Sequence, residues 1–169
     1  MGGIDTNQYR RRGIGSLKAA RKISEKVIMT TTFQCDIVSA RGEIFSGKVA
    51  MVFAVGTDGE LGIYPRHTPL FTRLKPGTVK VRDEAGEDQF FAVYGGILEV
   101  QPHVVTILAD TVLRGEELDR AAAEAAKAEA ERELASHTGR MDIAQAEVKL
   151  LKALAELRTL DRLRKSARR

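Results

Sequence analysis

The hydrophobic pattern changes its period near Asp110, and this change divides the chain into two parts with different secondary structure. Before this point, apolar residues alternate with polar ones in short segments, which is typical of β-strands with one face on a core. After it, alanine, glutamate, lysine and leucine dominate, and apolar residues recur every three or four positions, as on an amphipathic helix. The predicted fold class is β followed by α, with an N-terminal antiparallel β-sandwich and a C-terminal two-helix antiparallel hairpin.

The predicted sandwich covers residues 30–112. Residues 33–37 and 78–82 alternate strictly between apolar and polar side chains. Two nearly continuous apolar runs, 49–55 and 104–109, are expected to be strands covered on both faces. Turn signals recur about every ten residues, and no helix-length segment separates the strands. Antiparallel hairpins in a sandwich or flattened barrel are therefore expected, and a parallel sheet is not.

The predicted hairpin covers residues 113–169. Its helices are expected over 116–136 and from about Met141 to Arg164, with Gly139 suited to the left-handed position past a helix end. The apolar face of the second helix consists of Ile143, Ala146, Leu150, Leu154, Leu157, Leu160 and Leu163. Because the first helix offers mainly alanine, the pair buries little area by itself. The hairpin is expected to need the sandwich, or another protein, to complete its burial, and so to be able to move.

The positive net charge belongs largely to the first residues of the chain. Residues 1–28 carry seven lysines and arginines against two acidic residues, so a total of +4 becomes −1 without them. A general nucleic-acid-binding function therefore loses its main support. The simplest interpretation of 1–28 is a basic extension outside the fold, with translation able to start at Met29; an interaction arm or targeting segment is the alternative. A lone Cys35 excludes an internal disulfide, and no apolar run is long enough to span a bilayer.

The candidate chemical groups do not form a recognisable catalytic or metal set. The three histidines, His67, His103 and His137, have no ligand at the spacing of a zinc site. Glycines at 56, 59 and 62 lack the Gly-Lys-Ser/Thr ending of a phosphate loop, so turns explain them better. Glu60 and His67 are the polar groups of a segment rich in glycine and proline. An acid/base pair is one interpretation, and a buried or surface-contact role for His67 is the favoured one.

Positive charge also gathers at the C-terminal end. Six of the last twelve residues are basic: Arg158, Arg162, Arg164, Lys165, Arg168 and Arg169. Basic residues late in a helix interact favourably with its dipole, which explains part of this excess. Six exceed what a dipole needs, so an acidic partner surface is the functional interpretation.

Several distinctive segments occur in a fixed order along the chain. They are Asp36–Ala40, Phe45–Gly47, Gly59–Leu70, Leu74–Gly77, Gly95–Val100, Val105–Asp110, Arg114–Gly115 and Leu118–Asp119. In these segments and in the helical hairpin, the chain from Phe33 to about Arg164 resembles the epsilon subunit of bacterial F-type ATP synthases. The resemblance covers most of the chain and leaves residues 1–28 outside it.

The resemblance implies a non-catalytic central-stalk rotor subunit of a proton-translocating ATP synthase, at the cytoplasmic face of the bacterial inner membrane. Such a subunit joins the gamma subunit to the polar loops of the c-ring, and its C-terminal helices regulate ATP hydrolysis. By motif match, Glu60 is implied to lie near the c-ring and His67 to face gamma. Arg158, Arg162, Arg164 and Lys165 match the basic residues that approach an acidic surface of the catalytic beta subunits in the alpha/beta hexamer. Contact with the membrane is implied only through the complex.

One departure from the family concerns cofactors. Some members bind ATP through a Leu/Ile-Asp-x-x-Arg-Ala motif at the start of the first helix. Here Ala122 stands at the arginine position, and Arg120 lies two residues earlier, about 200° around the helix. This difference argues against nucleotide binding, and no cofactor is expected.

Two other functions are compatible with the residues alone. The first is a free-standing sandwich-and-hairpin adaptor that binds an acidic protein or nucleic acid. Copurification from membranes with gamma and the catalytic subunits distinguishes it from a rotor subunit. The second is an enzyme using Glu60 and His67, for which alanine at both positions should abolish turnover.

Overall fold

The computed structural model describes residues 31–136 and 139–168. The fold lies in the unit Thr31–Arg169. The predicted basic extension, 1–28, and His137 lie outside the described residues.

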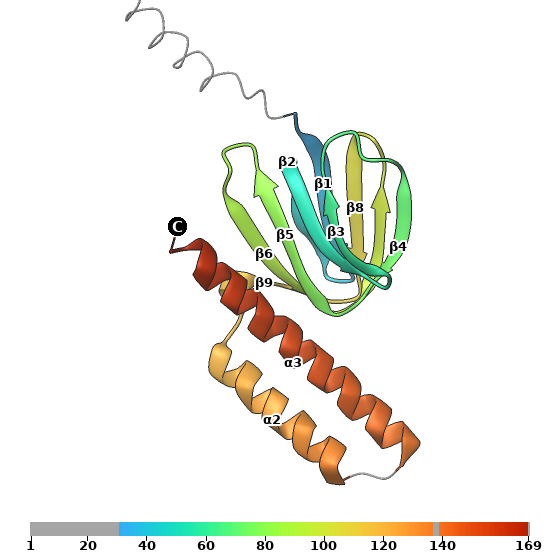
Figure 1. The fold of residues 1–169 in the computed structure, drawn as a ribbon, viewed down its shortest axis with the longest axis vertical. Helices are drawn as coiled ribbons and strands as arrows, with labels where there is room; N and C mark the ends of the chain where they lie inside the picture. The colour runs from blue at the N-terminus through green and yellow to red at the C-terminus, as the bar shows by residue number, and fades with distance from the viewer. Residues whose placement is uncertain (1–30, 137–138, 169) are drawn as a thin grey trace, which may run out of the picture. The chain divides into compact units, whose positions relative to one another are not determined.

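The described residues form nine strands, one 3₁₀ turn and two α-helices (Figure 1). The strands are β1 (Phe33–Ser39), β2 (Gly42–Gly56), β3 (Gly59–Ile63), β4 (Leu70–Leu74), β5 (Gly77–Asp83), β6 (Asp88–Val93), β7 (Gly96–Val100), β8 (Val104–Ala109) and β9 (Val112–Arg114). The helical elements are η1 (Gly115–Glu117), α2 (Arg120–Ser136) and α3 (Arg140–Ser166). The predicted fold class, a β-sandwich followed by a two-helix hairpin, is confirmed.

The long strand β2 joins two groups of strands, because it pairs with β1, β3, β4 and β5 along its length. On one side the order is β1-β8-β7-β4, and on the other β5-β6-β9. All pairs are antiparallel except β1 with β8, which run parallel from Gln34–Val104 to Ser39–Ala109. The antiparallel pairs agree with the expectation that the sheet is not a parallel one, and β1 with β8 is the single parallel pair among the described strands. The strands between β1 and β8 supply the long connection that a parallel pair requires, so no crossover helix is needed.

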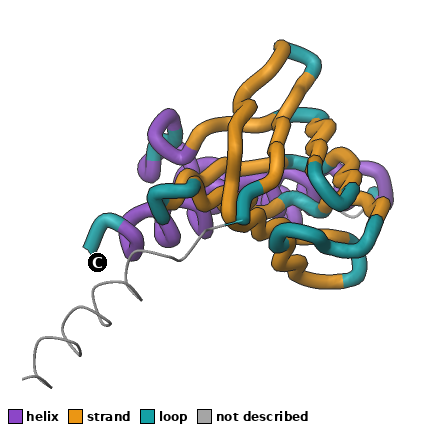
Figure 2. The backbone as a smooth tube through the Cα atoms, turned by 90° about the horizontal axis from the view of Figure 1, so that it is seen from above, coloured by secondary structure: helices purple, strands orange, loops and turns teal. Residues whose placement is uncertain are grey.

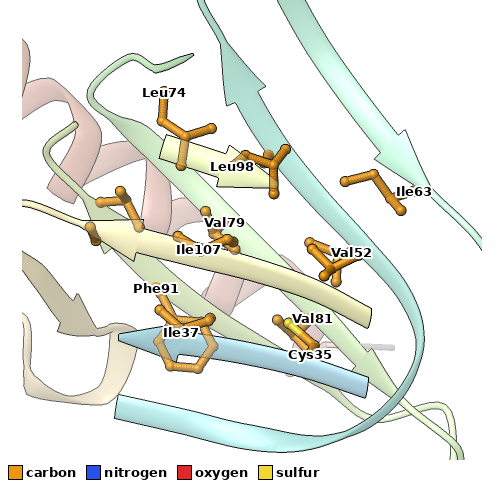
Figure 3. Close-up of a cluster of buried hydrophobic side chains, with 14 of the residues drawn as sticks. Cys35, Ile37, Val52, Ile63, Leu74, Val79, Val81, Phe91, Leu98 and Ile107 are labelled. Atoms are coloured by element: carbon orange, nitrogen blue, oxygen red, sulfur yellow. The ribbon is translucent and has the colours of Figure 1, made fainter. Parts of the chain in front are cut away.

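The core lies between the strand groups and is filled by the inward side chains of alternating positions (Figure 3). In β1, Phe33, Cys35 and Ile37 are all buried, as their alternation predicts. Burial, reinforced by the negative charge of Asp36, raises the pKa of the Cys35 thiol to about 12, so this cysteine is an apolar core residue.

The apolar run 104–109 is a strand, but the prediction that both its faces are covered is wrong. Val105, Ile107 and Ala109 are buried, whereas Leu108 is 53% exposed. Continuous apolarity had suggested two covered faces, yet β8 has core on one side only. Its outward face therefore carries an apolar side chain that nothing in the described chain covers.

The first long helix starts later than the sequence pattern suggested. Glu116 and Glu117 belong to η1, and Leu118 is extended. Asp119 then caps α2: its carboxylate accepts a hydrogen bond from the Ala122 amide at 2.9 Å. Because aspartate satisfies free amides at a helix N-terminus, the helix begins directly after this residue, at Arg120, rather than at 116. The sheet also continues through Arg114, so the helical part begins after the expected residue 113.

Gly139 is not in the left-handed conformation expected of a helix stop. Its φ and ψ are −75° and 131°, and it stands as the N-cap of α3, where its carbonyl accepts a hydrogen bond from the Ile143 amide. Glycine is tolerated at an N-cap because it leaves the first turn accessible to water. The second helix, Arg140–Ser166, is slightly longer than predicted at both ends.

Helix α3 lies between α2 and strands β5 and β6 (Figure 1). Figure 2 shows the same backbone with helices in purple and strands in orange. Small side chains make this close approach possible. Ala123 and Ala130 in α2, and Ala146 and Ala153 in α3, are buried at seven-residue spacing, two helical turns. The predicted apolar face of α3 is half-buried along its leucines and fully buried at Ala146.

Candidate functional site

The segment Gly59–Leu70 forms β3 and a tight turn. The His67 amide donates to the Tyr64 carbonyl at 3.1 Å, Pro65 occupies the second position, and Arg66 has a φ of 64°. This is the pattern of a type II turn, in which the third position normally requires glycine or asparagine. The turn leaves Tyr64 61% exposed, and His67 half-buried beside it.

His67 and Glu60 are not brought together as an acid/base pair. The Nδ1 atom of His67 lies 2.7 Å from the Thr68 carbonyl, which only accepts, so Nδ1 carries the hydrogen of this bond. Glu60 instead lies 3.4 Å from the Arg162 guanidinium of α3. No hydrogen bond or ion pair joins Glu60 to His67 in the described part of the chain.

Four residues of α3, here called the docking row, hold the hairpin against the sandwich. The docking row consists of Lys152, Glu156, Thr159 and Arg162. Spacings of three and four residues place them on one side of the helix. None of the four was assigned to the sandwich contact by the sequence pattern, which pointed to leucines.

At the centre of the docking row, two buried hydroxyls meet. Thr159 Oγ1 lies 2.9 Å from Thr78 Oγ1 of β5, and it also donates to the Ala155 carbonyl at 2.8 Å. A hydroxyl has one hydrogen to donate. Because Thr159 donates its hydrogen to the Ala155 carbonyl, Thr78 is the donor in the bond between the two hydroxyls. The Thr78 hydroxyl thus depends on the docked helix for its partner.

At both ends of the docking row, charged side chains of α3 contact aromatic side chains of the sandwich. The Tyr94 hydroxyl donates to Glu156 at 2.5 Å, and the Lys152 ammonium lies 5.8 Å from the Tyr94 ring centre. Burial and the neighbouring Glu156 carboxylate raise the pKa of Tyr94, so the phenol stays protonated as a donor. At the other end, the Arg162 guanidinium lies 4.5 Å from the Phe53 ring centre, within range of a cation–π contact, while it pairs with Glu60.

The predicted basic residues have different surroundings. Arg162 is engaged with the sandwich, whereas Arg158, Arg164 and Lys165 are exposed. Lys165 and Arg162 help line an open cavity of about 490 Å³ beside Lys80 and Arg82 of β5. The structure therefore joins two residues, Glu60 and Arg162, that the resemblance assigned to opposite partners.

Near this cavity, Asp88 accepts two hydrogen bonds from Arg82, at 2.7 and 3.0 Å. Arg82 holds the pKa of Asp88 below its usual value.

Stability from a depressed carboxyl pKa is present above the unfolded-state pKa and is lost as the pH falls through the folded-state pKa. Asp88→Asn should therefore lower the free energy of unfolding by about 1–2 kcal/mol at pH 7. Urea titrations should show this difference shrinking below about pH 4, and a difference independent of pH would contradict the assignment.

An exposed apolar surface, here called the apolar face, covers the outside of strands β4, β7, β8 and β1. It consists of the exposed Phe71 and Leu108 and the half-buried Val38 and Ile97. Ile97 pairs with Leu108, and Leu108 with Val38, so these three form one row across neighbouring strands. Phe71 is 69% exposed on β4. The sequence analysis missed this surface, although apolar residues at both parities of β8 were the available signal.

The residues at the position of the family's ATP-binding motif have partners within the chain. Asp119 caps α2, and Arg120 pairs with Asp161 of α3 at 2.6 Å. Among the described residues, no group of three histidine, cysteine, aspartate or glutamate side chains is placed to hold a metal ion. No helix in the described part has a stretch long and apolar enough to cross a membrane.

An exposed apolar face on a β-sandwich is a feature of the class of proteins that bind other proteins. Two family models match the chain. The ATP synthase delta/epsilon chain β-sandwich domain matches residues 32–115, and its long α-helix domain matches residues 116–161.

Curated relatives named ATP synthase epsilon chain match over nearly their whole length. That of Nitrosococcus oceani is 54% identical over 137 residues, covering 81% of this chain and 98% of the relative. That of Stenotrophomonas maltophilia is 54% identical over 136 residues, covering 80% and 97%.

Among solved structures, a chain of the Euglena gracilis mitochondrial ATP synthase superposes with a TM-score of 0.69 at 23% identity, covering 75% of this chain and 79% of that one. A chain of the Tetrahymena thermophila mitochondrial ATP synthase central stalk/c-ring structure gives 0.53 at 14%, covering 77% and 97%. These two show a shared fold. The chain belongs to the ATP synthase delta/epsilon family and is an epsilon-type, non-catalytic, peripheral subunit of that complex.

Proposed function

We propose that this subunit acts in the central stalk, at the cytoplasmic face of the bacterial inner membrane, where it joins the gamma subunit to the c-ring and restrains ATP hydrolysis. The observation that carries the proposal is the docking row. It holds a regulatory hairpin to the sandwich through polar and cation–π contacts, which water replaces at modest cost when the helix leaves.

The apolar face is the proposed site for gamma. Large exposed apolar side chains on one sheet face favour a protein–protein contact, and Phe71 and Leu108 are both more than half exposed. His67 precedes β4, the strand that carries Phe71, which supports its proposed position on the gamma side. A rigid sheet with an exposed apolar outer surface suits attachment to a rotating subunit, because the transmission of torque requires a contact that does not deform.

Glu60 and Arg162 are proposed to serve two states of the hairpin. While the hairpin is docked, they neutralise each other at 3.4 Å. When α3 leaves the sandwich, Glu60 becomes free for the polar loops of the c-ring, and Arg162 joins Arg158, Arg164 and Lys165 toward an acidic surface of beta. Exposed ion pairs contribute only about 0–1 kcal/mol, so this pair biases the equilibrium without locking it.

The two states must differ by only a few kcal/mol for partners to select between them. The docked state gains from small buried side chains such as Ala155 and from a few hydrogen bonds worth about 1 kcal/mol each. The half-buried leucines of α3 are then available for a second protein surface. This small difference supports a switch.

Removal of residues 118–169 tests the proposal. The cut keeps β9 and η1, so that the sheet and the Arg114 contact with the Ile44 carbonyl remain. ATP synthase assembled with the truncated subunit should hydrolyse ATP several times faster than the complete complex, because the restraining helix is absent. Assembly, measured by copurification with gamma, should be unchanged.

A matched control replaces Arg158, Arg164 and Lys165 by serine within the complete chain. This variant keeps the docking row and should relieve hydrolysis partly. Equal hydrolysis rates in the truncated, substituted and unaltered complexes would rule out a restraining function for the hairpin.

A further inference from the structure

We propose that the cavity between the β5–β6 hairpin and the last turns of α3 binds a small phosphate-bearing anion, and that this anion holds the helical hairpin in its docked position. The site follows from the geometry of this chain, whereas its effect on ATP hydrolysis rests on the proposed function. The cavity measures about 490 Å³, within the size range of small-molecule sites. Its walls come from the sandwich and from α3, whose C-terminal end lies beside β6, so it exists in this form only while the hairpin is docked (Figure 1).

Positive side chains converge on this cavity from two elements that are far apart in the sequence. The cations are Lys80 and Arg82 of β5 and Arg162 and Lys165 of α3, and Ser166 adds a hydroxyl. Residues 29–169 as a whole carry a net charge of −1, so four cations around one cavity are a local concentration of positive charge. Cations gathered in this way repel one another, and a bound anion removes that repulsion.

On the strand side, two carboxylates offset part of this charge. Asp88 accepts hydrogen bonds from Nε and one Nη atom of Arg82 and lies 3.7 Å from the Lys80 ammonium. A distance of 3.7 Å is too long for a hydrogen bond, so Lys80 keeps its three donors for a ligand. The exposed Glu87 also lines the cavity. Arg82 is therefore engaged by Asp88, while Lys80 is available.

On the helix side, Lys165 makes no hydrogen bond or ion pair with any residue that the structure describes. Arg162 has a single acidic partner, Glu60, at 3.4 Å, which leaves most of its guanidinium donors unused. Among the described residues at the cavity, the four cations outnumber the carboxylates of Asp88, Glu87 and Glu60 by one. Available donors thus line the cavity on both of its walls.

A phosphate group is the ligand that this arrangement fits. Ammonium, guanidinium and hydroxyl donors from separate elements match an anion with several acceptor oxygens and more than one negative charge, whereas a single carboxylate of a protein partner uses fewer of them. The described residues 118–123, at the position of the family's ATP-binding motif, do not line the cavity, so this site is separate from that motif. A bound phosphate keeps Arg162 and Lys165 at the sandwich and away from the proposed acidic surface of beta.

Calorimetric titration of the full chain with pyrophosphate tests the site, with chloride holding the ionic strength constant. Lys165→Gln and Lys80→Gln should each weaken binding about tenfold, because each removes a charged donor. Arg164→Gln is the matched control: it makes the same change of charge one residue away, on a side chain that does not line the cavity. It should change the affinity less than twofold. The basic residues 1–28 contribute the same background to every variant.

Amide hydrogen exchange in α3 tests the link to docking. At ten times its dissociation constant, pyrophosphate should reduce release of the hairpin about tenfold in the unaltered chain, and about twofold at the same concentration in Lys165→Gln. Tight binding without slower exchange in α3 would place the anion elsewhere and overturn the inference. Equal affinities of Lys165→Gln and Arg164→Gln would show general charge attraction in place of a site, and would overturn it as well.

Vesicles of phosphatidylcholine with phosphatidic acid distinguish a free anion from a lipid headgroup. Lys165→Gln and Arg164→Gln should bind these vesicles equally, and a loss confined to Lys165→Gln would overturn the assignment to a free anion. All three tests use the isolated subunit, so their failure leaves the proposed function standing. If pyrophosphate passes them while the truncated complex hydrolyses ATP no faster than the complete one, the proposed function fails and the anion site remains.

Discussion

Gly96→Ala is expected to destabilise the sandwich by about 4 kcal/mol and to lower its melting temperature by roughly 10–15 °C. Gly96 begins β7 with a φ of +127°, and a Cβ built there would lie 2.2 Å from the Leu108 carbonyl oxygen and 2.8 Å from Ala109 Cα. Both neighbours are backbone atoms of the paired strand β8, so no side-chain rotation relieves the clash. The two strands must separate, and they carry the core residues Leu98 and Ile107.

Gly42→Ala separates this clash from backbone strain. Gly42 has a similar φ of +118°, yet nothing lies within 4 Å of the added Cβ. Its substitution should therefore cost only the strain, about 1–2 kcal/mol. Thermal unfolding of both variants measures the difference, and equal melting temperatures would show that β8 does not press against Gly96.

Thr159→Val is expected to raise the equilibrium constant for release of the hairpin from the sandwich about 30-fold, which is a change of about 2 kcal/mol in the free energy of docking. The change keeps the shape of the side chain but leaves the buried Thr78 hydroxyl without its acceptor. In the released state water accepts from Thr78, so the loss falls on the docked state alone. Thr78→Val should cost less, because Thr159 still donates to the Ala155 carbonyl. The double valine variant should dock nearly as well as the unaltered chain.

Amide hydrogen exchange in α3 measures this equilibrium, since the released hairpin is marginally stable and exchanges quickly. The order of protection should be unaltered chain, double variant, Thr78→Val and then Thr159→Val. Equal exchange in the two single variants would refute the donor assignment. If the proposed function holds, Thr159→Val should also restrain ATP hydrolysis more strongly in the assembled complex, because more helices are available to beta.

The sequence predicted much of the architecture because the patterns involved are local. Alternation at Phe33, Cys35 and Ile37 is the direct imprint of a pleated strand on a core, and all three are buried. The change of period near Asp110 likewise marks the passage from strands to helices. Start and stop signals were less reliable: α2 begins at Arg120, after the cap Asp119, rather than at Glu116, and Gly139, expected to end the first helix, caps the start of the second.

The candidate site was only partly accessible from sequence. Glu60 and Arg162 were both singled out, but on opposite partners, and their pairing across 102 positions had no local signal. Thr78 and Thr159, separated by 81 positions, are ordinary residues in the sequence. Their importance arises only from being buried against each other. The strain at Arg66 is similarly visible only in the backbone.

The sequence by itself determined the β-strands, the two helices and membership of the delta/epsilon family, since each depends on residue order within short segments. Only the tertiary structure decided which face of α3 meets the sandwich, that a row of polar and charged residues takes part in this contact, and that β8 leaves Leu108 uncovered. The physical reason is that helix periodicity offers several faces of similar apolarity. The choice among them depends on how closely two backbones can approach, and here alanine and threonine permit the closest approach.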